Sequence, residues 1–517
     1  MTNADLWTYA VILGLYLLLM AGTGVYFSRR QTSTSAYFTA GRSISGWVMG
    51  ISLFATVVSS VSFIAYPGAG YAGRWQDSVV PVLGSPLLLI PVILVLIPMY
   101  RELISISVYE YIERRFDRVA RVYSTISFFL ANFAKLAFVF YLVALTVNTM
   151  TGWNIYTVTV VVGIVTVFYT ILGGIEAVIW TDVIQGVILW IGGIFALGYI
   201  LLIAPHGPGE IFQYAVANHR FDFGSTELTV AKPTLLIMLC LGFYEGLQKY
   251  AGDQTIVQRF LVTTTGREAG KGAIIGIVVT ILCAVFFTFI GTCLWSFYHL
   301  PGNVLPAGIA AGKAENVFPY FLQTRVPAVL TAVVLAALMS AAMSTVSSVL
   351  NGFGAVGVED YYRLLRPAAT DRERLTVGRI IICVAGVLCI GLSLFLIPSK
   401  GTAMALWWVV APIVSAGIVG LFFLALVSTR TNRQGVYAGI AAATGFTAWA
   451  TFTLDANHAF DLGFLATPIH GSVTGIISGL LFVIVGYGVS FLFPDNSPEK
   501  KALTYWGWRA KRQTEQP

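Results

Sequence analysis

The chain has 517 residues, of which 57% are hydrophobic and only 11% are charged. A water-soluble protein usually carries about 25% charged residues, so this composition excludes a soluble fold and predicts a chain that lies mostly within a membrane. The net charge of +7 does not indicate nucleic-acid binding, because most of the 31 lysines and arginines fall in loops on one predicted side of that membrane.

Thirteen apolar runs have about the 20-residue length that crosses ~30 Å of hydrocarbon. We expect transmembrane helices near 6–27, 45–72, 79–100, 122–148, 154–172, 180–204, 233–253, 272–298, 327–350, 376–398, 403–428, 434–453 and 472–493. The first run follows an acidic start and lacks a small-residue cleavage site, so we expect it to be retained rather than removed as a signal peptide.

The basic loops set the predicted orientation in the inner (plasma) membrane. They are expected to be cytoplasmic and include Arg115, Arg121 and Arg259. The N-terminus of this multi-pass protein is then outside, and an odd number of spans leaves the C-terminal tail in the cytoplasm.

Two spans are interrupted, and each opens a group of five. The first reads ATVVSSVSFIAYPGAGY from Ala55, and the second reads LGFYEGLQKYAGDQ from Leu241, with Glu245, Lys249 and Asp253 inside it. Unwound backbone at membrane depth is tolerated only where it lines a cavity, so corresponding breaks predict an inverted-repeat transporter. The alternative is that serines and glycines merely allow close helix packing.

The fold class predicted from this pattern is all-α integral membrane, with about 13 transmembrane helices. We expect four parts: a leading transmembrane helix in 1–40, a first repeat in 41–204, an external loop and second, inverted repeat in 205–429, and two trailing helices with a cytoplasmic tail in 430–517.

The densest polar cluster inside an apolar span is LAALMSAAMSTVSSVLNG, residues 335–352. Residues three and four apart adjoin on a helix, which groups the hydroxyls of Ser344, Thr345, Ser347 and Ser348. Hydroxyl and carbonyl oxygens are hard donors that suit a small alkali cation better than a transition metal. One hydroxyl often bonds back to the preceding turn, but four together favour a sodium site.

Four charged residues interrupt apolar spans. Asp182 either caps a helix or supplies a negative charge to a second sodium ion. Lys135 lies mid-span, where a buried ammonium costs at least ~2.5 kcal/mol, so we expect it to face a cavity, an anion or a hydrogen-bond network. Glu245 and Lys249 are four residues apart. Structural pairing and solute contact remain equally open for these last three residues.

Three strings resemble the sodium/solute symporter family: GGIEAVIWTDVIQG from Gly173, GDQTIVQRFL from Gly252 and AAMSTVSSVLNG from Ala341. The family transports solutes such as sugars, sialic acids and monocarboxylates, and the resemblance runs from about residue 6 to 493. It implies a LeuT-like core of two inverted five-helix repeats, with one leading and two trailing helices. Sodium would lie between the broken first core helix and the eighth.

The resemblance also implies site residues. The core sodium site would use carbonyls of Ala55, Val58 and Ala341 with hydroxyls of Ser344 and Thr345. The second sodium site of sialic-acid-type members would correspond to Asp182, Ser344, Ser347 and Ser348. The candidate solute site takes Ser59, Ser62, Asp77, Lys135, Phe243, Glu245 and Lys249.

The solute site departs from both nearest branches of the family. Sialic-acid members carry an arginine where Lys135 stands and a threonine where Val57 stands. Lys135 can still bind a carboxylate, but it lacks the bidentate fork of an arginine. The aromatic inner gate of sugar members falls at Lys249, with Tyr250 one residue away.

These observations predict a secondary active transporter, not an enzyme, that couples a small polar solute of sialic-acid, sugar or carboxylate type to one or two sodium ions by alternating access. All five histidines fall in predicted outside loops or at span ends, which favours sodium over protons as the coupling ion. A proton-coupled transporter and a transporter-like membrane sensor remain alternatives. The expected partners are the solute and membrane lipid, with no nucleic acid and no obligatory protein partner.

Overall fold

The computed structural model of the chain is helical in the residues that it describes, which are 3–204, 207–230, 232–310, 312, 314–397, 413, 415–453 and 469–515. Within them, eight helices are long and apolar enough to cross a membrane, and the bent pair α3 (Gly46–Val57) and α4 (Ser60–Ala72) adds a ninth span. The prediction of an all-α, multi-pass membrane protein is confirmed.

The remaining spanning helices are α1 (Asn3–Ser28), the segment from α6 (Val80–Gly84) to α8 (Ile97–Leu103), α10 (Arg118–Thr151), α11 (Ile155–Leu202), α15 (Gly266–His299), α18 (Ala328–Val356), α20 (Asp371–Leu396) and α24 (Gly471–Val489). Four more helices are α13 (Leu235–Leu247), α14 (Gln254–Val262), the short apolar helix α22 (Ile418–Val427) and α23 (Arg433–Thr453). The predicted span 403–428 is described only in part, because residues 403–412 and 414 lie outside the described ranges.

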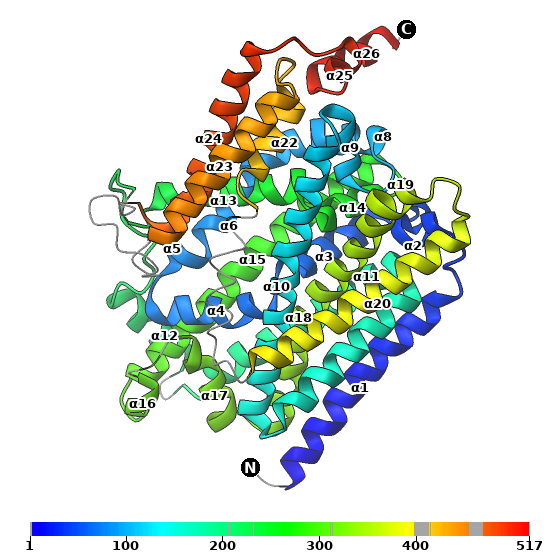
Figure 1. Cartoon of the computed structure of the whole chain (residues 1–517). Coiled ribbons are helices and arrows are strands. Elements are labelled where there is room, and N and C mark those ends of the chain that lie inside the picture. Colours follow the sequence, from blue (N-terminus) through cyan, green and yellow to red (C-terminus); the bar gives the residue numbers. More distant parts are fainter. Residues whose placement is uncertain are drawn as a thin grey trace.

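The connecting helices gather at two faces (Figure 1). The face with the C-terminus carries α9 (Val108–Arg115), α19 (Arg363–Leu365), α25 (Pro498–Ala502) and α26 (Tyr505–Glu515). The opposite face, near the N-terminus, carries α12 (Pro208–Ala217), α16 (Ala307–Ala310) and α17 (Val317–Arg325).

The first break separates α3 from α4 by a bend of 69°. Val58 (φ −84°, ψ 120°) and Ser59 (φ −113°, ψ 176°) are extended there. The break comes at the end of a run of three β-branched residues, Thr56, Val57 and Val58, which are weak helix formers. Pro67 lies inside α4 and does not end it. The interruption therefore falls at mid-span, where it leaves the last carbonyls of α3 without helical partners.

The second break lies between α13 and α14. A π-helical turn, Gln248–Gly252, follows α13, and Asp253 is extended at φ −90° and ψ 116°. The Asp253 side chain accepts a hydrogen bond from Thr255 N at 2.8 Å, which caps α14 and fixes where the helix resumes. Both spans predicted to be interrupted are interrupted in the structure.

Helix α11 is a hairpin of two helical arms. Its 48 residues would extend about 72 Å, far more than a bilayer, if it were straight. Gly174 (φ 57°, ψ −158°) breaks it, and a Cβ there would lie 2.7 Å from Tyr37 O, so only glycine fits. Both arms run along α1: Tyr169 abuts Gly24, and Gln185 Nε2 donates to Tyr16 Oη at 3.2 Å.

Helix α18 occupies the centre of the molecule, beside α10, α11 and α20 (Figure 1). Every residue from Val334 to Asp360 is buried. The hydroxyl cluster of this helix therefore faces only other helices and the cavities between them.

The prediction that Arg115, Arg121 and Arg259 lie in loops is wrong, because they belong to the helices α9, α10 and α14. Arg115 and Arg259 are 0% exposed and Arg121 is 5% exposed. Arg115 Nε donates to Ala425 O at 3.3 Å, and Arg121 pairs with Asp360. These arginines are structural contacts within the protein, because buried guanidinium groups require fixed acceptors.

Candidate functional site

The break after α3 meets the hydroxyl cluster of α18. Ser344 Oγ donates to Ala55 O at 2.8 Å, and Thr345 Oγ1 donates to Thr56 O at 3.4 Å. Both hydroxyls also reach Ala341 O, at 3.3 and 3.2 Å. Two hydroxyls and three carbonyls thus converge in a buried position at the break between α3 and α4.

Local structure explains why these carbonyls are available. At the end of α3, Phe54 O accepts the N–H of Val58, and the next two carbonyls, of Ala55 and Thr56, receive the hydroxyls of α18. The carbonyl end of a helix carries a partial negative charge. The break therefore turns that charge towards Ser344 and Thr345.

The donor set fits a small alkali cation. Oxygens that share a hard cation lie about 2.3–2.6 Å from it, so neighbouring ligands are roughly 3.0–3.6 Å apart. The separations around Ser344 and Thr345, 2.8 to 3.4 Å, overlap that range and begin slightly below it. Val58, the remaining predicted ligand, is 1% exposed and stands at the break, but among the described residues no hydroxyl of Ser344 or Thr345 donates to its carbonyl.

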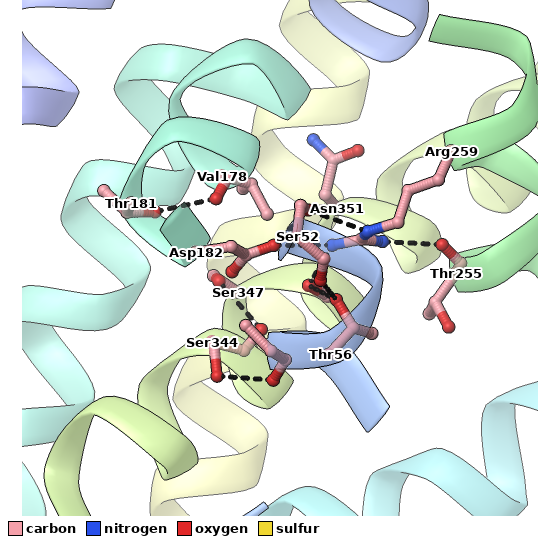
Figure 2. A network of polar contacts seen from close by, with 12 residues as sticks. Ser52, Thr56, Val178, Thr181, Asp182, Thr255, Arg259, Ser344, Ser347 and Asn351 are labelled. Atoms are coloured by element: carbon pink, nitrogen blue, oxygen red, sulfur yellow. Dashed lines mark hydrogen bonds and ion pairs between the residues drawn. The ribbon is translucent and has the colours of Figure 1, made fainter. Parts of the chain in front are cut away.

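In the view of Figure 2, Asp182 lies above Ser344, within the same buried network. Its Oδ2 accepts from Arg259 Nη2 at 2.8 Å and from Ser52 Oγ at 2.6 Å, and both ionised side chains are 0% exposed. Arg259 also donates to Ser348 Oγ at 2.6 Å. Asp182 stands eight residues beyond Gly174 within the second arm of α11, so the alternative that it caps a helix is wrong.

The second predicted sodium ligand set is only partly free. Asp182 Oδ1 is buried and has no hydrogen-bond partner among the described residues. Ser347 Oγ donates to Ser344 O at 3.2 Å and contacts neither charge, whereas Ser348 Oγ already accepts from Arg259. Ser348 is thus joined to Asp182 through Arg259, Ser347 is joined to Ser344, and the charge of Asp182 is shared with Arg259.

Arg259 is the site residue that sequence reasoning missed. It was assigned to a loop, although apolar residues flank it in the string IVQRFLV. These apolar neighbours, in a segment predicted to lie outside the membrane, were the sign in the sequence that Arg259 is buried. Ser52 and Thr56 carried no such signal, because single hydroxyls are common in apolar helices.

Two cavities flank the helix breaks. The larger, of about 780 Å³, is lined by Ser59, Lys135 and Asp253, and the smaller, of about 550 Å³, by Ser62 and Asp77. Three residues, Val57, Glu245 and Lys249, line both cavities. The structure therefore brings six of the seven predicted solute-site residues to the two cavities. The seventh, Phe243, lines neither and is 40% exposed.

The charged groups of these cavities differ in how they are paired. Lys249 Nζ lies 3.2 Å from Glu245 Oε2, and Arg74 Nε lies 3.4 Å from Asp77 Oδ2. Lys135 is exposed to the larger cavity and has no hydrogen bond or ion pair among the described residues. Its ammonium is therefore available to a ligand.

The second break is closed on the face that carries the C-terminus. Tyr100 Oη donates to Ala251 O at 2.7 Å and Tyr109 Oη donates to Gly252 O at 3.1 Å. Gln254 bridges the same region, since its Nε2 donates to Ile106 O at 2.7 Å. The smaller cavity is lined instead by Arg74 and His470, from the opposite end of the bundle.

Comparison with known proteins gives consistent results. The family model for the sodium:solute symporter family matches residues 37–442. The sodium/sialic acid symporter NanT of Aliivibrio fischeri is 31% identical over 94% of this chain and 93% of its own length, and SiaT of Proteus mirabilis is 30% identical over 92% and 94%. The solved structure of a substrate-bound, outward-open Na⁺-coupled sialic acid symporter superposes with a TM-score of 0.84, at 28% identity, over 95% of this chain and 98% of that one.

Proposed function

Since the chain belongs to the sodium:solute symporter family, we propose that the cavities at its two helix breaks bind a small carboxylate-bearing solute, with sialic acid as the first candidate. The protein is a sodium-coupled symporter that works by alternating access. The proposal concerns the residues that hold the ions and the chemistry of the solute.

The core sodium ion is proposed to bind Ala55, Val58, Ala341, Ser344 and Thr345. The observation that supports this choice is the meeting of the freed carbonyls of α3 with the hydroxyls of α18. A second ion is proposed at Asp182, Ser344, Ser347 and Ser348, supported by the buried, unpartnered Oδ1 of Asp182.

Lys135 supports the proposal that the solute carries a carboxylate. An ammonium without a partner in a cavity at membrane depth is costly, and an anionic ligand would compensate it. A lysine presents a point charge rather than a planar fork, so recognition would be less directional than with arginine. Ser59, Ser62, Asp77, Glu245 and Lys249 are proposed to contact the polar remainder of the solute.

Thirteen spans are proposed in the inner (plasma) membrane. The count follows if the two arms of α11 are separate spans and if α13 with α14, the partly described segment ending in α22, and α23 each cross once. The repeats would be 41–204 and 205–429, with the N-terminus outside and the C-terminus in the cytoplasm. The proposal needs no partner beyond the solute and membrane lipid.

Uptake into proteoliposomes tests the proposal. Purified protein should accumulate radiolabelled sialic acid, or another small carboxylate such as pyruvate, only when sodium is present outside. Glucose and proline serve as uncharged and zwitterionic comparisons, and choline replaces sodium in the control. Accumulation that follows a pH gradient and ignores sodium would refute the assignment of sodium sites, and transport of glucose alone would refute the carboxylate.

A further inference from the structure

A third cavity lies at the face that carries the N-terminus, apart from the helix breaks. It has a volume of about 480 Å³ and lies among the ends of α4 and α15, the residue Arg220 after α12, and α16. Among the described residues, no acidic side chain lines this cavity, but the basic residues Arg220 and His299 line it. The cavity therefore presents positive charge without a compensating carboxylate.

Arg220 is fixed in a defined orientation. Its backbone N–H donates to Ala215 O at 3.0 Å, and its Nη2 donates to Tyr71 O in the last turn of α4. The guanidinium lies over the ring of Trp295, with its central carbon 4.2 Å from the ring centroid. Partial burial lowers the pKa of Arg220, but arginine stays charged near neutral pH.

Donors of this guanidinium remain unused. Arg220 Nε is buried and has no hydrogen-bond partner, and no carboxylate of the described residues forms an ion pair with Arg220. A buried N–H without an acceptor is unfavourable by an amount comparable to a lost hydrogen bond. The remaining donors of a planar fork match a carboxylate in shape and charge.

Aromatic rings form the wall beside these donors. His299 stacks on Trp295 with ring centroids 4.3 Å apart, and both residues line the cavity, whereas Tyr214 stacks on the same Trp295 ring at 5.5 Å from outside the lining. His299 Nδ1 lies 2.8 Å from Trp295 O, which leaves its Nε2 as the ring nitrogen that can meet a ligand. The cavity thus combines one cationic fork with flat apolar surfaces.

We propose that this cavity is an outer anion site that takes the carboxylate of the solute before the solute moves to the helix breaks. The identity of the anion rests on the proposed function, but the site itself rests on Arg220 and its surroundings. An uncompensated cation at the outer face raises the local concentration of anions and so the rate of capture. Inorganic anions such as phosphate share this chemistry, and the experiment separates them from carboxylates.

The stacking of Arg220 on Trp295 provides a direct readout. We expect titration of the purified protein with sialic acid or pyruvate, at constant ionic strength, to change tryptophan fluorescence saturably. The change should be absent in Trp295→Phe and should need about tenfold or more higher ligand concentration in Arg220→Gln. Arg220→Lys keeps the charge and loses the fork, so we expect an intermediate affinity.

Matched variants separate this site from the central cavity. Lys135→Gln should keep the fluorescence change, and Arg325→Gln, which alters an exposed arginine outside this cavity, should leave it unaltered. In transport, Arg220→Gln should raise KM severalfold and leave kcat unchanged, because it acts before the solute is bound centrally. Gel filtration and the fraction of protein that binds sodium check that each variant is folded.

The outcomes that overturn the proposal are distinct. A fluorescence change that survives Arg220→Gln, or none with any anion tested, refutes the site. A change produced by phosphate and not by carboxylates refutes the capture role. If the Arg220-dependent change is present but no carboxylate is accumulated with sodium, the proposed solute is wrong and the outer anion site stands.

Discussion

Replacing Ser347 with alanine separates the two proposed sodium sites. Ser347 Oγ makes one described hydrogen bond, to Ser344 O at 3.2 Å, and it contacts neither Asp182 nor Arg259. The substitution therefore removes a ligand of the second site without leaving a buried charge unpaired, and its effect on folding should be about 1 kcal/mol or less. Asp182→Ala lacks this advantage, because it would leave Arg259 alone in the protein interior.

The expected effect on transport follows from charge. A tenfold sodium gradient supplies about 1.4 kcal/mol per ion, and a potential of ~100 mV supplies about 2.3 kcal/mol per net charge moved. A carboxylate carried with two sodium ions moves one net charge, and the driving force is about 5 kcal/mol. With one sodium ion no net charge moves, and about 1.4 kcal/mol remains. The limiting accumulation of solute then falls from several thousandfold to about tenfold.

The assay measures solute accumulation in proteoliposomes with the potential set by valinomycin and potassium. We expect wild-type accumulation to increase with a negative interior and to depend on sodium with a Hill coefficient above one. In Ser347→Ala, accumulation should ignore the potential and the Hill coefficient should fall to one. Ser340→Ala, which removes a buried hydroxyl that donates to Ala336 O and is no proposed ion ligand, serves as the control. Voltage-dependent accumulation that persists in Ser347→Ala would refute the second site.

Three further results are expected. Ser344→Ala combined with Thr345→Ala should raise the sodium concentration for half-maximal initial uptake by about tenfold or more, and an unchanged value would exclude the core site. Lys135→Gln should weaken binding of a carboxylate solute by about tenfold to a hundredfold, whereas Lys135→Arg should retain or improve this binding. Equal equilibrium affinity in the wild type and both variants would show that Lys135 does not contact the solute. Asp182→Ala and Arg259→Ala should each lower the free energy of unfolding by roughly 3–5 kcal/mol, and the double variant should lower it by less than the sum of the two. Additive shifts in thermal unfolding would show that the pair is not coupled.

Local patterns in the sequence predicted the helices and the hydroxyl cluster well. Ser344 and Thr345 were recognisable because helical spacing alone places their hydroxyls together, and the structure aims both at carbonyls of α3. The breaks were also recognisable, but their positions were not. Pro67 is the obvious helix breaker in the first, yet α4 continues through it and the chain is extended at Val58 and Ser59.

Pairings between distant residues were beyond sequence reasoning. Asp182 and Arg259 are 77 residues apart, and nothing local indicates that the two side chains meet. Arg220 is another example: in the sequence it is one arginine of a predicted loop, and only the structure places it over Trp295. In both cases the three-dimensional arrangement decides whether a charge is solvated, paired or available.

The charges around the sites also explain how sodium and solute depend on one another. The core ligands carry no formal charge, and the charge of Asp182 is balanced by Arg259, so a sodium ion in the core has no dedicated counter-ion. The carboxylate proposed for the solute would supply one from the adjoining cavity. Opposite charges in a medium of effective dielectric constant about 20 attract more strongly than in water, so each partner would strengthen the binding of the other. Sodium alone would then bind too weakly to move efficiently without solute, and coupling would arise from shared electrostatics rather than from direct contact between the two ligands.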